Sequence, residues 1–262
     1  MPNLWCFLVL SLLCSPLYAQ ETPNPNSDAS PSSEPKIEIS DPLKTEFEIG
    51  FQANTGNTDS RTFNTRLSAE YTEGRYRSSG LLKFYNLYED GDESKRRSNY
   101  EFQLDYKTGV RTYRYGSFDG TDSQYTAYYQ DYTISAGFGY QLQNTENWRL
   151  EWELGPGYRY QKPNLDEIDD DDIVFETTVK EPIVRTQLTS QWQALKSVSL
   201  ENIVTVIAGG SNTRVENEFN ITNKITEGIA VKISHNLTFH NKVPSGLDKT
   251  DTTTNVNLLF SF

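Results

Sequence analysis

The chain has 262 residues, of which 36 are acidic and 24 basic, and a formal net charge of −12. Such an acidic protein lacks the basic surface that nucleic-acid binding requires, so we expect no nucleic-acid partner. The mean hydropathy of −0.65 excludes a bundle of membrane-spanning helices. Sixteen Tyr, thirteen Phe and four Trp residues are enough to form aromatic girdles at two membrane interfaces.

Residues 4–19 form an apolar segment without a charged side chain. The segment is shorter than the ~20 residues of a membrane-spanning helix, and Ala19 suits cleavage by signal peptidase. We therefore predict a signal peptide over residues 1–19. The bulky Leu17 and the lack of an early Lys or Arg depart from the usual pattern. The alternative is a buried N-terminal strand or helix.

Both cysteines, Cys6 and Cys14, lie in this segment, so the mature chain would have no disulfide, thiolate metal site or cysteine nucleophile. Leu13 is too bulky for lipoprotein cleavage before Cys14. Residues 20–43 are rich in Pro, Ser, Asn, Asp and Glu, which predicts a flexible periplasmic linker. Residues 44–262 are expected to form one domain.

Apolar and polar residues alternate in twelve segments of this domain, as in strands with one apolar and one polar face. Most segments exceed the ~5–6 residues typical of strands in soluble sandwiches. Their length and even number favour an all-β fold, a transmembrane antiparallel β-barrel of about twelve strands. The predicted strands are residues 44–54, 61–72, 75–89, 99–106, 110–118, 131–142, 148–161, 182–194, 198–206, 214–221, 229–240 and 254–262.

The apolar face of each strand is expected to meet lipid, and the polar face the lumen. Phe102 and Gln103, for example, point to opposite sides of the wall. The same rule places Arg114 in the lumen and its neighbours Tyr113 and Tyr115 on the lipid face.

The connections between the predicted strands fall into two classes. Tight turns are predicted at residues 72–74, 108–109, 144–147, 195–197 and 226–228. Longer or more acidic connections are predicted at residues 88–96, 118–125, 163–172 and 244–251. Short periplasmic turns that alternate with longer extracellular loops are typical of bacterial outer membrane barrels. This arrangement places both termini in the periplasm.

Charged residues of both signs are dense on the predicted inner faces. Nine are candidates for lining the lumen: Arg66, Glu101, Arg149, Glu151, Glu153, Arg159, Arg185, Glu201 and Glu218. Eight more share these faces: Glu48, Glu70, Lys83, Asp105, Arg114, Arg214, Glu216 and Lys232. Because an unpaired charge in a confined space is costly, these groups are expected to pair across strands. They would form either a selectivity lining for ions and small polar solutes or a salt-bridged plug.

Residues 165–172, in one predicted outer loop, contain six carboxylates. Hard divalent cations prefer oxygen ligands, so the loop is a candidate site for Ca²⁺ or Mg²⁺. The candidate ligands are Asp166, Asp169, Asp170, Asp171 and Asp172. The run lacks the glycine turn of an EF-hand, and the alternative is a solvated acidic loop.

Catalytic chemistry has little support in the sequence. His235 and His240 are the only histidines, and alternation sends Ser234 to the opposite face from His235. No Gly-rich phosphate-binding loop follows a predicted strand. We therefore expect no enzymatic activity and no cofactor.

The last predicted strand ends on an aromatic residue. Val256, Leu258, Phe260 and Phe262 share its apolar face. Proteins inserted into bacterial outer membranes commonly have such a strand, which the barrel assembly machinery reads. We therefore predict that these four residues form an assembly signal.

Short motifs are spread in order along residues 44–262. They are Gly56–Ser60, Gly137–Tyr140, Gly155–Arg159, His240–Asn241, Val243–Pro244 and Lys249–Asp251. Their order and spacing resemble the YdiY-like outer membrane proteins, a family also called domain of unknown function 481 and described as salt-stress-induced. The resemblance implies a β-barrel, but it implies no established activity and supplies no catalytic residues.

These features predict a barrel in the outer membrane of a Gram-negative bacterium. Its expected partners are outer membrane lipid, lipopolysaccharide and the barrel assembly machinery. We expect an envelope protein for stress adaptation with at most a narrow polar lumen. The alternative is a passive, porin-like channel for ions or small polar solutes.

Overall fold

The computed structural model describes residues 42–54, 60–124, 128–163, 178–242 and 249–262. The predicted signal peptide and nearly all of the predicted linker lie outside these residues. No helix in the described part of the chain is long and apolar enough to cross a membrane. The described strands are β1 (Leu43–Asn54), β2 (Ser60–Glu73), β3 (Tyr76–Glu89), β4 (Asp92–Lys107), β5 (Thr112–Ser123), β6 (Tyr128–Asn144), β7 (Trp148–Pro163), β8 (Val179–Gln193), β9 (Val198–Gly209), β10 (Thr213–Lys224), β11 (Ile229–His240) and β12 (Thr250–Ser261).

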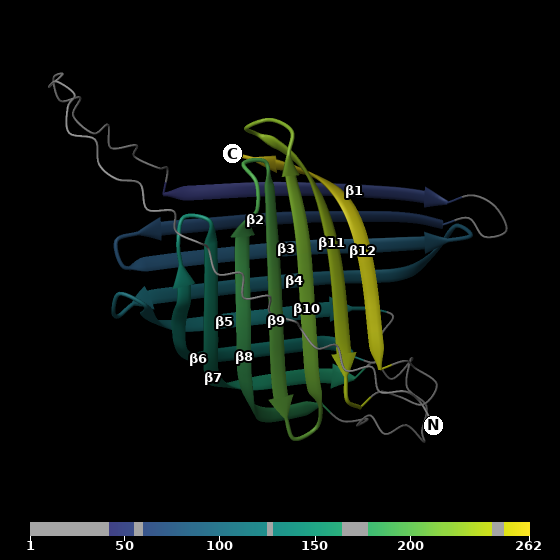
Figure 1. The fold of residues 1–262 in the computed structure, drawn as a ribbon. Coiled ribbons are helices and arrows are strands. Elements are labelled where there is room, and N and C mark those ends of the chain that lie inside the picture. Colours follow the sequence, from purple (N-terminus) through teal and green to yellow (C-terminus); the bar gives the residue numbers. More distant parts are fainter. Residues whose placement is uncertain (1–41, 55–59, 125–127, 164–177, 243–248) are drawn as a thin grey trace, which may run out of the picture. The chain divides into compact units, whose positions relative to one another are not determined.

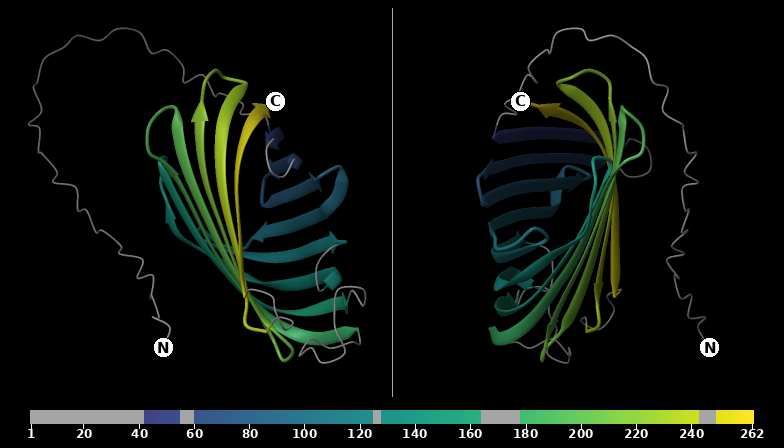
Figure 2. Two further views of the ribbon diagram at one scale, coloured as in Figure 1. Left: turned by 90° about the vertical axis from the view of Figure 1, so that its right-hand side faces the viewer. Right: turned by 60° about the vertical axis from the view of Figure 1, so that its left-hand side comes forward.

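Each strand pairs with its neighbours in the sequence, and β1 pairs with β12, so the sheet closes into a barrel. Strands β8–β12 of one wall cross strands β1–β5 of the opposite wall (Figure 1). Figure 2 shows the two walls from other directions. This crossing reflects the strand tilt that closure requires. The prediction of a twelve-stranded antiparallel barrel is confirmed.

Burial distinguishes the two faces of the barrel wall. Large apolar side chains are exposed on the outer face, with Leu67 at 50% and Phe102 at 53%. The buried side chains of the described strands are mostly polar or charged, and Glu48, Arg159 and Gln161 are at most 1% exposed. An apolar exterior around a polar interior is the arrangement of a barrel that spans a lipid bilayer.

Aromatic rings gather on the outer face near the two ends of the strands. Toward the short turns, the rings of Tyr76 and Tyr106 lie 5.1 Å apart, and Trp148 is 42% exposed. Toward the other end, the rings of Tyr132 and Tyr160 stack at 6.1 Å. Amphipathic rings at these two levels would sit at the lipid headgroups.

The connection predicted at residues 88–96 is acidic but not long, because a two-residue turn joins β3 to β4. Asp90 has φ 51° and Gly91 has φ 95°. Positive φ at both central residues gives the turn that matches the twist of paired strands, and Asp-Gly is a favoured pair for it. The connection predicted at 118–125 is also mostly strand, because β5 continues to Ser123.

The two faces of β5 are the reverse of those predicted. Tyr113 and Tyr115 are 4% and 3% exposed on the inner face, whereas Arg114 is exposed on the outer face. Gly139 of β6 explains the reversal, because a Cβ at this position would overlap the ring of Tyr113. The glycine leaves room for an aromatic ring inside the barrel.

The seam between β1 and β12 is shorter than the other strand pairs. Its register joins four residue pairs, from Glu46–Ser261 to Ile49–Leu258, against twelve between β1 and β2. The last residue, Phe262, extends the seam through two backbone hydrogen bonds with Thr45, of 3.3 and 3.0 Å. Beyond these contacts β12 curves away from β1 (Figure 1).

Candidate functional site: the charged lumen

Two polar cavities occupy the lumen. The turn-side cavity, of about 1020 Å³, reaches residues of the short turns such as Glu146 and Glu227. The loop-side cavity, of about 320 Å³, reaches Lys95 and Asp251 near the other end. The cavities are adjacent, because six residues line both: Arg66, Glu101, Asp119, Gln187, Ile203 and Lys232.

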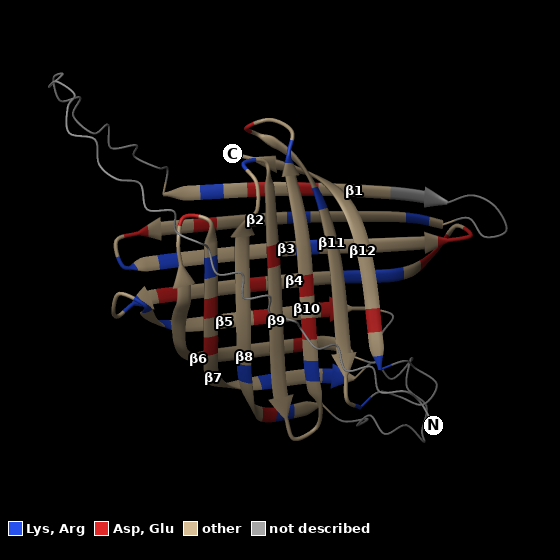
Figure 3. Ribbon diagram, in the orientation of Figure 1, with Lys and Arg blue, Asp and Glu red and all other residues tan. Residues whose placement is uncertain are grey.

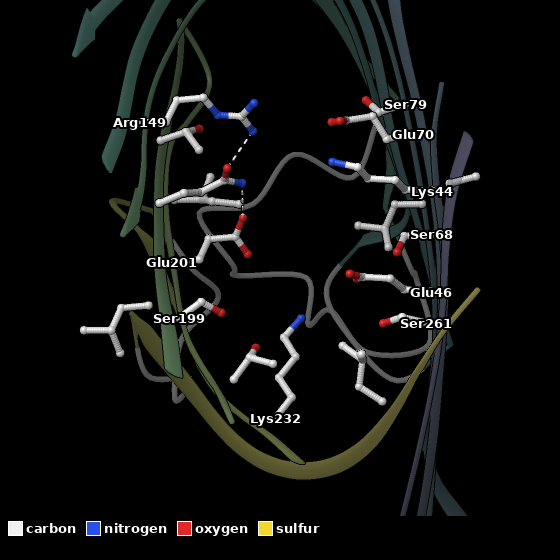
Figure 4. A pocket seen from close by; sticks show the side chains of 18 of the residues that line it. Lys44, Glu46, Ser68, Glu70, Ser79, Arg149, Ser199, Glu201, Lys232 and Ser261 are labelled. Atoms are coloured by element: carbon white, nitrogen blue, oxygen red, sulfur yellow. Dashed lines mark hydrogen bonds between the residues drawn. The ribbon is translucent and has the colours of Figure 1, made fainter. Parts of the chain in front are cut away.

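The turn-side cavity has charged groups on opposite walls. Lys44 and Glu46 of β1 face Arg149 and Glu201 across the open centre (Figure 4). Arg149 donates a 2.5 Å hydrogen bond to Gln191, which donates one of 2.6 Å to Glu201. Nine acidic and six basic residues line this cavity, and this surplus of negative charge favours cations.

Ion pairs cross the lumen between strands that are not neighbours in the sheet. Lys83 Nζ of β3 lies 2.8 Å from Glu218 Oε2 of β10. It also lies 3.5 Å from Glu101 Oε1 of the neighbouring strand β4. Arg214 Nη1 of β10 lies 2.6 Å from Asp131 Oδ2 of β6. These contacts fill part of the cross-section and narrow the lumen.

A third cross-lumen pair joins β3 to β7. Arg77 Nη2 lies 3.0 Å from Glu151 Oε2 and 2.7 Å from Asp105 Oδ2. The guanidinium also covers the ring of Tyr113 at 5.4 Å, and the Tyr113 hydroxyl donates a 2.9 Å hydrogen bond to Glu153. This network places an aromatic ring among the lumen charges.

Glu48 accepts hydrogen bonds from several side chains on the side of the barrel where β1 pairs with β12. Its carboxylate accepts hydrogen bonds from Arg66 at 2.5 Å, Lys232 at 2.9 Å and Asn257 at 3.1 Å. The side chain is 1% exposed, so its charge is stabilised by these donors and not by water.

Toward the long connections, Arg159 ties the β9–β10 turn to the wall. Its guanidinium donates to Glu181, to Ser211 Oγ at 3.0 Å and to the Asn212 carbonyl at 2.8 Å. Arg159 is fully buried and lines neither cavity. Its surroundings indicate a structural contact.

The other eight candidate lumen residues line one or both cavities. Arg66 and Glu101 line both, and Glu218 lines the loop-side cavity. The remaining five line the turn-side cavity: Arg149, Glu151, Glu153, Arg185 and Glu201.

Several charged lumen residues were not among the sequence-based candidates, and Arg77, Asp119 and Asp131 are instructive examples. Arg77 lies six positions before Lys83 and therefore shares its face, a signal that was present in the sequence. Asp119 lines both cavities and lies 3.9 Å from Arg185, on the reversed strand β5. The connection predicted at 118–125, which is strand in the structure, concealed it.

Three residues of the predicted assembly signal, Val256, Leu258 and Phe260, lie on the outer face of β12, and Phe262 follows the end of this strand. Val256, Leu258 and Phe262 are exposed, the last at 83%. Phe260 packs against Phe47 of β1 with 6.5 Å between ring centroids. The four residues therefore present an apolar edge beside the seam.

The candidate calcium ligands Asp166 and Asp169–Asp172 lie outside the described residues. In the part that is described, no group of three or more Asp, Glu, His or Cys residues could hold a metal ion. His235 Nδ1 lies 2.8 Å from Thr254 Oγ1, and His240 Nδ1 lies 2.9 Å from the Asn212 amide nitrogen. The two histidines occupy separate polar contacts.

The closed sheet, apolar exterior, aromatic bands and charged lumen define a transmembrane β-barrel. Residues 47–262 match the family described as "Protein of unknown function, DUF481". The chain belongs to this family, as its motifs predicted. It is also 26% identical over 230 residues to the "Uncharacterized protein YdiY" of Escherichia coli (strain K12), covering 84% of this chain and 83% of that protein.

Solved structures with a similar architecture include an outer membrane channel from Pseudomonas putida F1. The TM-score is 0.49 at 12% identity, covering 88% of this chain and 100% of the channel. The NanC porin aligns with a TM-score of 0.47 at 9% identity, covering 84% of this chain and 97% of the porin.

Proposed function

We propose that the protein resides in the outer membrane of a Gram-negative bacterium and provides a narrow polar passage for small cations or small polar solutes. Its short turns and both termini would lie in the periplasm. The cross-lumen ion pairs would limit the size of the solute.

The observation that carries this proposal is the pair of adjacent cavities with a shared lining. Arg66 and Lys232, which line both cavities, and Lys83, which lines the loop-side cavity, bond to Glu48 and Glu218 on the inner wall. Polar groups that are already paired can exchange partners with a passing ion or solute. The acidic surplus of the turn-side cavity supports a preference for cations.

Single-channel recording in planar bilayers tests the passage directly. The refolded wild type is expected to show a small conductance, and the reversal potential in a KCl gradient should indicate a preference for K⁺. The double variant Lys83→Ala, Glu218→Ala removes one cross-lumen pair without leaving a lone buried charge, and its conductance should rise.

Arg61→Gln is the matched control for this experiment, because Arg61 is exposed at the loop end of β2 on the face of Phe63. Its conductance should equal that of the wild type. The absence of any measurable conductance in both the wild type and the double variant would contradict a passage.

The second candidate function is a non-conducting envelope protein used in stress adaptation. Cross-lumen pairs such as Arg77–Glu151, Lys83–Glu218 and Arg214–Asp131 favour it, since they would brace a closed lumen. It predicts no conductance together with sensitivity of a deletion strain to salt or to chelation of divalent cations. Recording and growth assays on the same strain separate the two candidates.

A further inference from the structure

Arg114 presents a guanidinium on the outer face of the barrel, where most of the large exposed side chains are apolar. Its register partners are Tyr106 on β4 and Phe138 on β6. The guanidinium carbon lies 5.9 Å from the centre of the Phe138 ring. No carboxylate forms an ion pair with Arg114 in the described ranges. An arginine beside hydrocarbon is costly unless its charge finds a partner.

Three more basic residues lie at the short turns at this end of the barrel, all of them exposed. Arg75 lies between β2 and β3, Lys107 ends β4, and Arg111 precedes β5. The backbone N–H of Lys107 donates a 2.8 Å hydrogen bond to the Arg75 carbonyl, so the two turns lie side by side. Basic residues mark both turns in Figure 3. We call Arg75, Lys107, Arg111 and Arg114 the basic rim.

The acidic residue Glu73 lies at the end of β2, beside Arg75. Its carboxylate accepts a 2.7 Å hydrogen bond from the Tyr71 hydroxyl. Asp105 and Glu151, at the same end, are engaged inside the lumen with Arg77, so the exposed rim has a surplus of positive charge. The rim therefore offers a positively charged surface to an anionic partner.

The neighbouring tyrosines indicate at which level of a bilayer the positive charge of the basic rim lies. Tyr106 packs against Tyr76 at 5.1 Å on the same outer face. Tyr rings of this kind sit at the level of lipid headgroups, and an Arg side chain near that level can extend its charge toward them. The planar guanidinium matches two phosphate oxygens at once.

We propose that the basic rim binds the phosphate of a membrane phospholipid, with Arg114 as the principal contact. The acyl chains would lie along the apolar outer face that Leu104 and Phe138 provide, at 52% and 69% exposure. The proposal rests on the membrane location argued above, but it does not require that the lumen conduct.

Titration of the folded barrel in dodecyl maltoside, a detergent without phosphate, with phosphatidylglycerol tests this site. The thermal transition, followed by heat-modifiable migration on gels, should rise in a saturable manner for the wild type. Arg114→Gln should weaken the apparent affinity by about tenfold, the loss expected for a charge-assisted pair. Arg114→Lys should retain part of the response, and Arg61→Gln all of it.

Three outcomes would overturn the lipid site. An identical response of wild type and Arg114→Gln would remove Arg114 from it. An equal rise with inorganic phosphate would indicate a free anion and no lipid. An equal loss in Arg61→Gln would indicate a general charge effect. A protein that binds the lipid without conducting would contradict the proposed passage alone, whereas one without heat-modifiable migration would contradict both proposals.

Discussion

Glu48 is the residue on which the charge balance of the seam side depends. Replacing it with Gln leaves Arg66 and Lys232 beside a neutral group, with little water to compensate. Loss of one partner from such a buried cluster costs about 3–5 kcal/mol. We therefore expect the urea midpoint of Glu48→Gln in micelles to fall clearly.

Glu46→Gln is the control for this variant, since Glu46 is half-buried on the same strand and faces the open turn-side cavity. Its midpoint should move little. Equal shifts in the two variants would show that the Glu48 contacts carry no special stability.

Gly139 gives a second prediction, based on shape. Gly139→Val forces its side chain into the space of the Tyr113 ring, and overpacking of this kind costs about 1–3 kcal/mol. Tyr113→Ala should relieve the strain, so the double variant should be more stable than the sum of the single changes predicts. Additive free energies of unfolding would argue against the close approach.

Gly139 and Tyr113 also show how far the inner and outer faces of single residues could be predicted from the sequence. Alternation identified most inner residues, because charge marks the polar face of a strand. On β5 the rule was wrong, because Tyr113 and Tyr115 are aromatic and yet lie inside. A glycine on the inner face of the next strand was the available signal. Reading it requires the register between two strands, which a single sequence does not provide.

At the level of elements, the β1–β12 seam is the weakest junction of the barrel. Removing Phe262 takes away its two backbone hydrogen bonds with Thr45 and leaves the seam with its register of four pairs alone. We expect a lower fraction of folded, heat-modifiable protein after refolding. In cells the loss should be larger, because the predicted assembly signal is damaged as well.

Val110→Ser is a suitable control, since Val110 is 87% exposed in the β4–β5 turn. The substitution removes an apolar side chain about as exposed as that of Phe262. Normal amounts of the shortened protein in the outer membrane fraction would contradict the assembly signal. A loss in cells with normal refolding would support it.

All twelve strands were predictable, because each carries a long period-2 pattern. The residues at which the strands begin and end were less predictable. Residues 88–96 contain a run of charges that resembles a loop, but the Asp90–Gly91 pair within it makes a tight hairpin. Composition and turn chemistry disagreed there, and turn chemistry decided the structure.

For the whole molecule, the acidic run at Asp166–Asp172 remains a prediction outside the described residues. Six carboxylates repel one another, and Ca²⁺ would relieve this at about the millimolar affinity of extracellular modules. Changing Asp169–Asp172 to Asn should abolish any calcium-dependent rise in the thermal transition while the barrel still forms. Identical calcium responses of wild type and variant would favour a solvated loop.

The pairing of charges was expected, but the partners could not be named from the sequence. Lys83 and Glu218 meet because the diameter and strand tilt of the barrel bring β3 opposite β10. These quantities belong to the closed sheet and to no single segment. The sequence therefore predicted which kinds of side chain line the lumen, but not which of them form pairs across it.

The cross-lumen pairs also imply an order of events during folding. Lys83 and Glu218 are 135 positions apart and share no hairpin, so neither local pairing nor sheet growth from one end brings them together. They can meet only once the two walls face each other, and loop-closure entropy makes such distant contacts late. Their formation would mark the moment when an open, curved sheet becomes a tube.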